Sequence, residues 1–253
     1  MDITPPYGYE EIVPLNAEHR VALPDAAVVP PAFRSMMVIP LSFSEFAVAG
    51  HDYPMVFVSG DQGKSAAVMA VVGVEQQQNL FVKTDQSWDP TVYMPAYVRR
   101  HPFCMTRVNV DGTERAERIA CVEKRAISAA GEALHDAGGK ATPAWEARRK
   151  FLFEFEADLA RTEALCRMVV ELGLLEPFTM QATPNAGEPL SLTGMFRVQE
   201  QKLADLPADK LKELVNNGVL PRLYAHLMSM SNFNRLLARR GTRTAGAAGG
   251  NTG

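Results

Sequence analysis

The sequence of 253 residues lacks the motifs by which most enzymes reveal their chemistry. Its three cysteines, Cys104, Cys121 and Cys166, are odd in number and widely spaced, which argues against a disulfide framework or a paired zinc motif. We expect them to be small buried side chains in a reducing compartment. The five histidines form no HExxH or His-x-His pattern, and neither Gly-x-Ser-x-Gly nor Gly-x-Gly-x-x-Gly occurs. The sequence therefore predicts no catalytic residue, no metal site and no cofactor.

Strong charge and long apolar runs are missing as well. The formal net charge is −3, so there is no overall basic footprint for nucleic acid. No stretch approaches the ~18 apolar residues of a transmembrane helix, so we expect no integral membrane segment. Residues 1–6 are acidic and proline-rich, and they lack the basic and apolar regions of a secretory signal. We expect a cytoplasmic protein and leave peripheral association with the cell envelope open.

Two short patterns invite a functional interpretation that their context argues against. Gly63-Lys64-Ser65 resembles the end of a phosphate-binding loop, but Val58 stands where that motif requires glycine. A strand rather than a helix is predicted to follow it, so no helix N-terminus is available for a phosphate. Glu154, Glu156 and Asp158 lie close together in sequence, but alternate residues of a helix diverge. We predict a solvated helix face for these three carboxylates.

The first half of the chain has the pattern of an arm followed by strands. Residues 1–35 are rich in proline, which removes backbone donors and favours extended geometry. We predict an extended arm with one short strand that lies on the domain. Its apolar residues are suited to docking there: Ile12, Val13, Leu15, Val21 and Leu23. From 36 to 124 the apolar runs are short and separated by turns, which predicts an antiparallel sheet.

Two hairpins account for most of this predicted sheet. The first joins residues 55–58 to residues 66–74 through a turn rich in glycine and serine. The second joins residues 104–110 to residues 117–124 through Asp111-Gly112, a strong turn dipeptide.

The second half of the chain has helical periodicity. Apolar residues recur at steps of three and four over 145–175, with Thr142 as N-cap and Pro143 at the first helical position. A short helix is predicted over 207–216 and a longer one over 219–238. Residues 241–253 are rich in Gly, Ala and Thr and predict a disordered tail.

The remaining segments complete a fold of the α+β class. We expect one more strand over 79–83, another over 178–181, and a loop or insertion over 126–144. The long helix has a broad apolar face that needs a partner, and the sheet is the nearest one. We therefore predict a single domain over 36–240, with an antiparallel sheet in its first half packed against long helices in its second half.

The segment 88–103 is the strongest candidate for recognition. It contains Trp88, Tyr93 and Tyr97 as flat aromatic groups, and Arg99 and Arg100 as cations for a carboxylate, a phosphate or an acidic partner. His101 completes this candidate set. An alternative interpretation is an irregular connection held to the sheet by its aromatic residues, with the arginines paired locally.

Other polar residues form weaker candidates. His226 and Asn232 lie close together in the C-terminal helical region, and a buried histidine on an amphipathic helix is the competing explanation. His51 and Asp52 are adjacent, but a facial-triad His-x-Asp requires one residue between its two ligands.

Three sequence segments together resemble the SapC family of bacterial proteins. They are Asn79-Leu80-Phe81-Val82, then Tyr93-x-Pro95-x-Tyr97-Val98-Arg99-Arg100-x-Pro102-Phe103, and finally Leu223-Tyr224-Ala225-His226-Leu227-x-Ser229. The resemblance runs from about Pro14 to Leu237. The family name implies association with a bacterial surface layer, and the resemblance supplies no catalytic residue.

These observations favour a non-catalytic accessory or binding protein of the SapC type, linked to the envelope or surface layer, that recognises a peptide or acidic ligand. A peptide or protein partner is expected, and a homo-oligomer is a further option. One alternative is an enzyme with a dispersed site that uses His51, Asp52, His101 or His226. Another is a structural component of the surface layer, although lattice proteins are usually longer, richer in strands and poorer in cysteine.

Overall fold

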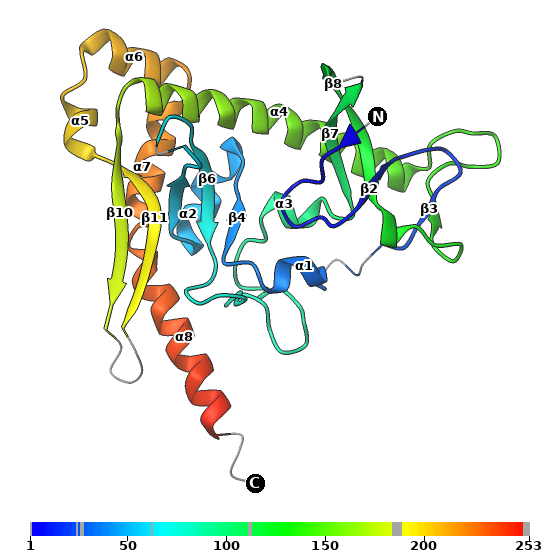
Figure 1. Cartoon of the computed structure of the whole chain (residues 1–253), viewed down its shortest axis with the longest axis horizontal. Coiled ribbons are helices and arrows are strands. Elements are labelled where there is room, and N and C mark those ends of the chain that lie inside the picture. The colour runs from blue at the N-terminus through cyan, green and yellow to red at the C-terminus, as the bar shows by residue number, and fades with distance from the viewer. Residues whose placement is uncertain are drawn as a thin grey trace.

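A computed structural model describes residues 2–23, 25, 28–61, 63–110, 113–183 and 189–249. The protein has an α+β fold in which two antiparallel sheets lie along one long helix, α4 (Pro143–Glu171). Figure 1 shows α4 running along the length of the molecule, with one sheet near each of its ends. Among the described residues, no helix combines the length and the apolar character needed to cross a bilayer.

The larger sheet has five strands. Its order is β10 (Leu175–Ala182), β11 (Leu190–Val198), β5 (Met55–Val58), β6 (Ala67–Val71) and β4 (Val38–Pro40). Every neighbouring pair is antiparallel. The hairpin predicted between 55–58 and 66–74 is confirmed as β5 and β6, and the strand predicted at 178–181 forms part of β10.

The smaller sheet brings the N-terminal arm and the second hairpin together. Its order is β1 (Asp2–Ile3), β7 (Phe103–Val110), β8 (Thr113–Glu123) and β2 (Ile12–Pro14). The arm therefore docks on the domain as predicted, but through paired strands rather than one short strand. The β7–β8 hairpin is confirmed, while its predicted turn, Asp111-Gly112, lies outside the described residues. A two-stranded sheet joins β3 (Arg20–Val21) to β9 (Glu132–Ala133).

Helix α4 begins as its sequence predicts. Thr142 is the N-cap, its hydroxyl accepts a hydrogen bond from the Trp145 backbone N–H, and Pro143 opens the helix. The helix ends at Glu171, just before Gly173, which has a φ of +63°.

The other helical elements are shorter and mostly cover the five-stranded sheet. They are α1 (Pro31–Arg34), η1 (Phe43–Glu45), α2 (Phe46–Asp52), α3 (Ala96–Arg99), η2 (Lys124–Ala126), α5 (Glu200–Ala204), α6 (Ala208–Asn216), α7 (Val219–Ser229) and α8 (Asn232–Gly249). The helix predicted at 207–216 is confirmed as α6, which follows Pro207 and is followed by Gly218 in the left-handed region.

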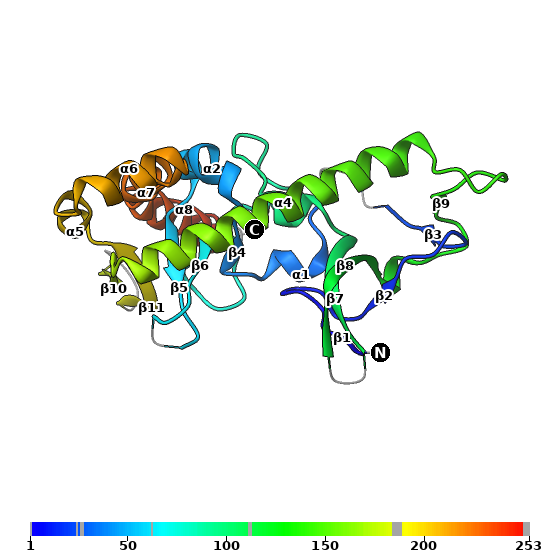
Figure 2. The ribbon, with the colours of Figure 1, turned by 90° about the horizontal axis from the view of Figure 1, so that it is seen from above.

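Two hydrophobic clusters form the core, and α4 belongs to both. Its Trp145 and Leu152 pack in a smaller cluster with Phe103 and Val122 of the four-stranded sheet. Farther along, apolar residues such as Phe155 join the larger cluster beneath the five-stranded sheet. Figure 2 shows how α4 passes from one sheet to the other. The single-domain organisation stays a prediction, but the long helix has the apolar partners that it was expected to need.

Several predictions about secondary structure were wrong. The strands of 36–124 divide between two sheets instead of forming one. No strand forms over 79–83, because the Asn79 side chain turns the chain by donating to the Phe33 carbonyl and accepting from the Phe81 N–H. Strand β11 was not predicted, since Gly194, with a φ of +76°, interrupts its alternating pattern.

The C-terminal region also differs from its prediction. The helix predicted over 219–238 is divided at Met230 and Ser231 into α7 and α8. Helix α8 then continues to Gly249, where a disordered tail was predicted from residue 241. Four arginines along α8 bind the body of the protein, which explains the extension: Arg235, Arg239, Arg240 and Arg243. Residues 250–253 lie outside the described residues.

Candidate functional site

The first part of the segment 88–103 is a structural connection. Trp88 is only 4% exposed, stacks on Phe81 with ring centroids 6.3 Å apart, and meets Tyr53 edge to face. It is therefore part of the core and not the surface platform that its aromatic character suggested. The competing interpretation, a connection held by its aromatic residues, holds for this end of the segment.

A buried carboxylate fixes the middle of the segment. Glu45 is 2% exposed, and its two oxygens accept four hydrogen bonds. Two come from the Ser42 backbone N–H and hydroxyl at 2.8 and 2.7 Å, in a capping box. The other two come from the Ala96 N–H at 2.7 Å and the Tyr93 hydroxyl at 3.0 Å. Through these four hydrogen bonds, Glu45 ties Tyr93 and the first residue of α3 to η1, at the start of α2.

This network also positions Arg99. The Arg99 Nη2 donates to the Tyr93 hydroxyl at 2.8 Å, and its Nε donates to the Met94 carbonyl at 3.0 Å. The guanidinium lies over the rings of Tyr93 and Phe151, at 5.4 and 5.0 Å from their centroids. Arg99 is nevertheless exposed, so its remaining N–H donors face solvent on the α4 side of α3.

Arg100 has the opposite environment. It is 4% exposed, and its guanidinium lies 4.0 Å from the Tyr97 ring centroid and 4.9 Å from that of Phe155. Tyr97 is itself buried and donates its hydroxyl hydrogen to the Tyr7 carbonyl at 2.7 Å. The two adjacent arginines of the sequence therefore point to different surroundings, one open to solvent and one enclosed by aromatic rings.

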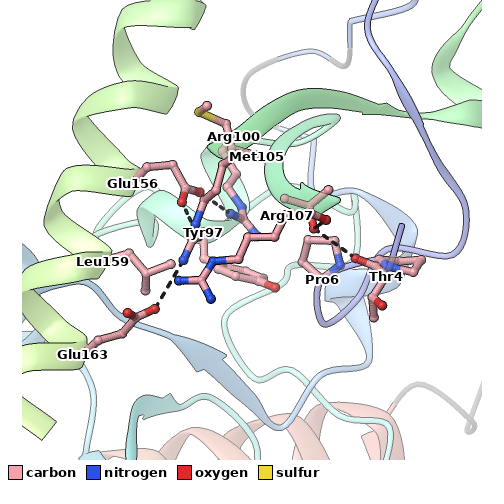
Figure 3. Close-up of a pocket in the computed structure, with 12 residues that line it drawn as sticks. Thr4, Pro6, Tyr97, Arg100, Met105, Arg107, Glu156, Leu159 and Glu163 are labelled. Carbon is pink, nitrogen blue, oxygen red and sulfur yellow. Dashed lines mark hydrogen bonds and ion pairs between the residues drawn. The ribbon is translucent and has the colours of Figure 1, made fainter. Parts of the chain in front are cut away.

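Tyr97 and Arg100 line a cleft with a volume of about 540 Å³ (Figure 3). The N-terminal segment forms one wall and α4 forms the opposite wall, with the β7–β8 hairpin between them. The other residues that line it are Thr4, Pro5, Pro6, Met105, Thr106, Arg107, Arg118, Glu156, Leu159 and Glu163.

A cluster of opposite charges lies in this cleft. Glu156 forms ion pairs with Arg118 through one oxygen and with Arg100 through the other, the latter at 3.7 Å. Arg118 also contacts Glu163 at 3.4 Å, at the more exposed rim. Burial raises the pKa of Glu156, and the charges of Arg118 and Arg100 oppose that increase. The cluster joins β8 to α4 and places guanidinium groups beside a carboxylate.

The cluster leaves some polar atoms without hydrogen bonds. Within the described residues, the buried Arg100 Nε and Glu156 Oε1 atoms have no hydrogen-bond partner. One is a donor and the other an acceptor, and both belong to residues that line the cleft. Buried polar atoms normally find partners, so this pair carries an uncompensated desolvation cost beside the cleft.

His101 and Cys104, which lie next to the cleft residues Arg100 and Met105 in the sequence, are poorly suited to proton transfer. Burial, together with the charges of Arg125 and Arg100, lowers the pKa of His101 to about 4, and its ring packs against Tyr9 and Phe33. Burial raises the pKa of the Cys104 thiol to about 12. At neutral pH both groups are therefore uncharged and enclosed.

The remaining sequence candidates are separated from this cleft. The Asp52 carboxylate accepts a hydrogen bond from the Tyr93 N–H at 2.8 Å. The His51 backbone carbonyl accepts one from the Arg235 side chain. His226 is fully buried, accepts from the Val198 N–H at 3.1 Å and lies against the Phe57 ring. Asn232 donates to the Gly50 and Tyr53 carbonyls.

These four residues therefore hold secondary-structure elements together, and the structure does not assemble them into one constellation. Burial lowers the pKa of His226 to about 4. Among the described residues, no three His, Cys, Asp or Glu side chains gather closely enough to hold a metal ion.

The roles of four residues that organise this region were not predicted from the sequence. Glu156 and Asp158 were predicted to lie on a solvated face, but Asp158 is 9% exposed and accepts from Ser44, and Glu156 pairs with arginines. Only Glu154 of that group is well exposed. Glu45 carried a usable signal, since Ser42-x-x-Glu45 is a capping-box pattern, whereas Arg118 carried none.

Comparison with known proteins gives one clear result. No curated protein and no solved structure matches this chain. The model of the SapC family matches residues 18–236, which cover most of the chain and include α3, α4 and the β7–β8 hairpin. The chain therefore belongs to the SapC family.

Proposed function

We propose that this protein is a non-catalytic binding protein that holds a peptide with an acidic side chain in the cleft between the N-terminal segment and α4. The observation that supports this best is the cluster of Arg100, Arg118 and Glu156 in the cleft, where the partly exposed Arg118 shares its charge between Glu156 and Glu163. A volume of about 540 Å³ is within the range of ligand pockets and suits a few residues of a peptide.

Strand β7 gives the peptide a backbone partner. The Glu123 N–H donates to the Pro102 carbonyl. Hydrogen-bonded residue pairs therefore recur at every second position along the β7–β8 hairpin, and Cys104 with Cys121 is one of them. Met105 occupies the intervening position, and its backbone groups therefore point away from β8, toward the edge that borders the cleft. Strand β1 ends at Ile3, before Pro5 and Pro6, which carry no N–H to continue the ladder. An extended peptide can add to this edge.

Electrostatics favour an acidic side chain on that peptide. Arg118 is partly exposed and shares its guanidinium between Glu156 and the rim residue Glu163. A carboxylate of the partner can replace Glu163 at Arg118 and form a charge-assisted pair. The family name points to the bacterial surface layer, so we expect a partner among envelope or surface-layer polypeptides, and an accessory role rather than a place in the lattice.

A peptide library displayed on phage tests this proposal. We expect panning against the full chain to enrich sequences with a shared acidic position, and synthetic peptides of that sequence to bind in fluorescence anisotropy. Arg118→Ala should weaken binding at least tenfold, while Glu163→Gln should strengthen it several-fold because it frees Arg118.

The control is Arg197→Ala, which removes a more exposed arginine from an ion pair with Glu176 on the five-stranded sheet. It should leave binding unchanged. Failure to enrich any shared sequence, or an equal loss of binding in Arg118→Ala and Arg197→Ala, would refute the proposal.

A further inference from the structure

A second cavity lies beside the first, between α3 and the N-terminal half of α4. Its volume is about 240 Å³. Three of the residues that line it are arginines: Arg99, Arg100 and Arg148. Among the described residues that line this cavity, none is acidic. Arg100 lines both cavities, but Arg99 and Arg148 do not line the peptide cleft. The second cavity is therefore positive, whereas the cleft contains both signs of charge.

Two guanidinium groups are available at this cavity. Arg99 uses its Nε and one Nη2 donor to bind Met94 and Tyr93, and it is held in place over the Phe151 ring. Arg148 is half-buried and takes part in no hydrogen bond or ion pair with the described residues. One arginine is thus preorganised, and the other has all five of its N–H donors free.

The rest of the cavity is apolar. Phe103 and Leu152 are almost fully buried and form its floor, and Phe151 is half-buried beside them. Bare inorganic anions gain nothing from such a floor, but an anion with a hydrocarbon or aromatic body buries that body against it. The volume limits the body to roughly one ring or a short chain.

We propose that this cavity binds a small amphiphilic oxyanion, with its carboxylate or phosphate head between Arg99 and Arg148 and its apolar body against Phe103, Phe151 and Leu152. The site is distinct from the peptide cleft and does not depend on the function proposed for that cleft. It accounts for the tandem arginine and the phenylalanine of the sequence motif, because Arg99, Arg100 and Phe103 all line it.

Four probes separate the contributions of the head and the body. Benzoate and phenyl phosphate carry both, inorganic phosphate carries the head alone, and benzyl alcohol carries the body alone. We expect the full chain, observed by protein NMR, to bind benzoate or phenyl phosphate at least tenfold more tightly than inorganic phosphate or benzyl alcohol. The preferred head then follows from comparing the two aromatic anions.

Variants of adjacent residues on α4 locate the binding site. Arg148→Gln should weaken binding of the preferred aromatic anion about tenfold, since it removes one charge-assisted contact. Arg149→Gln changes the neighbouring arginine, which does not line this cavity, and should leave binding unchanged. Arg118→Ala should also leave it unchanged, which separates this site from the peptide cleft.

Three results would overturn the proposal. The first is no saturable binding of either aromatic anion. The second is equal binding of inorganic phosphate and the aromatic anions, which would indicate nonspecific attraction to positive charge. The third is an equal loss in Arg148→Gln and Arg149→Gln. Folding of each variant is checked by circular dichroism, and a misfolded Arg148→Gln is replaced by Arg148→Lys, which keeps the charge but loses the planar fork and should bind several-fold more weakly.

Discussion

The two ends of the segment 88–103 lie in contrasting environments. From Trp88 to the middle of the segment the chain is held by the core: Trp88 packs on Phe81, and Glu45 accepts four hydrogen bonds from Ser42, Tyr93 and Ala96. At the Arg100 end, Glu156 is also mostly buried, yet one of its oxygens and the Arg100 Nε lack hydrogen-bond partners within the described residues. Residues at this end of the segment line both the cleft and the second cavity.

This difference separates a structural role from a binding role within one short stretch of sequence. A carboxylate that is fully satisfied by its own chain stabilises the fold but has nothing left to offer a ligand. A buried carboxylate and arginine with unused hydrogen-bonding capacity carry an uncompensated desolvation cost. We therefore propose that the recognition surface expected over the whole segment is concentrated at its second end, which lines the cleft.

The largest expected effect comes from Glu45→Gln. An amide group at this position presents its N–H₂ to two of the four donors, so two charge-assisted hydrogen bonds are lost. We expect the free energy of unfolding to fall by about 4 kcal/mol. Urea denaturation followed by circular dichroism measures this change. A loss below about 1 kcal/mol would contradict the structural role assigned to Glu45.

The fold was predictable where the signals were local. The Thr142–Pro143 start of α4 and both hairpins follow from caps and turn residues within a few positions of each element. The assignment of strands to two sheets did not follow, because β11 pairs with β5 across more than 130 residues of sequence.

The site shows the same limit. The segment 88–103 was identified from its composition, but Glu156 was misassigned because its partners, Arg100 and Arg118, come from outside its own helix. Helical periodicity reports which face of a helix is apolar, and it says nothing about a charged partner from another element. Arg148, for the same reason, carried no signal in the sequence.

The pH dependence of stability provides the second test. Burial lowers the pKa of His226 to about 4, below the ordinary value of 6.5. Between these values the folded protein binds fewer protons than the unfolded chain, so the stabilisation is present above pH 6.5 and is lost as the pH falls toward 4. We expect a loss of about 3 kcal/mol from this residue.

The variant His226→Gln isolates this contribution. It keeps an acceptor for the Val198 N–H but cannot titrate, so its free energy of unfolding should fall less steeply between pH 6.5 and 4 than that of the wild-type protein. His101→Phe should flatten the same profile, because the pKa of His101 is also about 4. Identical profiles for the wild-type protein and both variants would show that neither histidine is held neutral by the fold.

The third test compares the same substitution at two buried carboxylates, Glu156 and Glu45. Glu156→Gln makes the same chemical change as Glu45→Gln, but among the described residues one carboxylate oxygen of Glu156 has no hydrogen bond. The substitution removes the counter-charge of the buried Arg100, which lowers stability, and it also relieves the burial of the carboxylate charge, which offsets part of that loss. We expect a loss of about 2 kcal/mol in the same urea experiment. A loss as large as that of Glu45→Gln would remove the distinction between the two ends.

The smallest effect on stability separates the two ends most sharply. Arg239 of α8 binds Asp89 at 2.8 Å and lies 4.5 Å from the Phe81 ring centroid, at the Trp88 end of the segment. Its ion pair is partly exposed, so Arg239→Ala should cost about 0.5 kcal/mol, less at high salt, and should leave peptide binding unchanged. Arg118→Ala removes a partner of the mostly buried Glu156, so it should cost more stability, and it should weaken peptide binding at least tenfold. Measuring both quantities for both variants tests the separation directly, since loss of peptide binding in Arg239→Ala would mean that the two ends act as one unit.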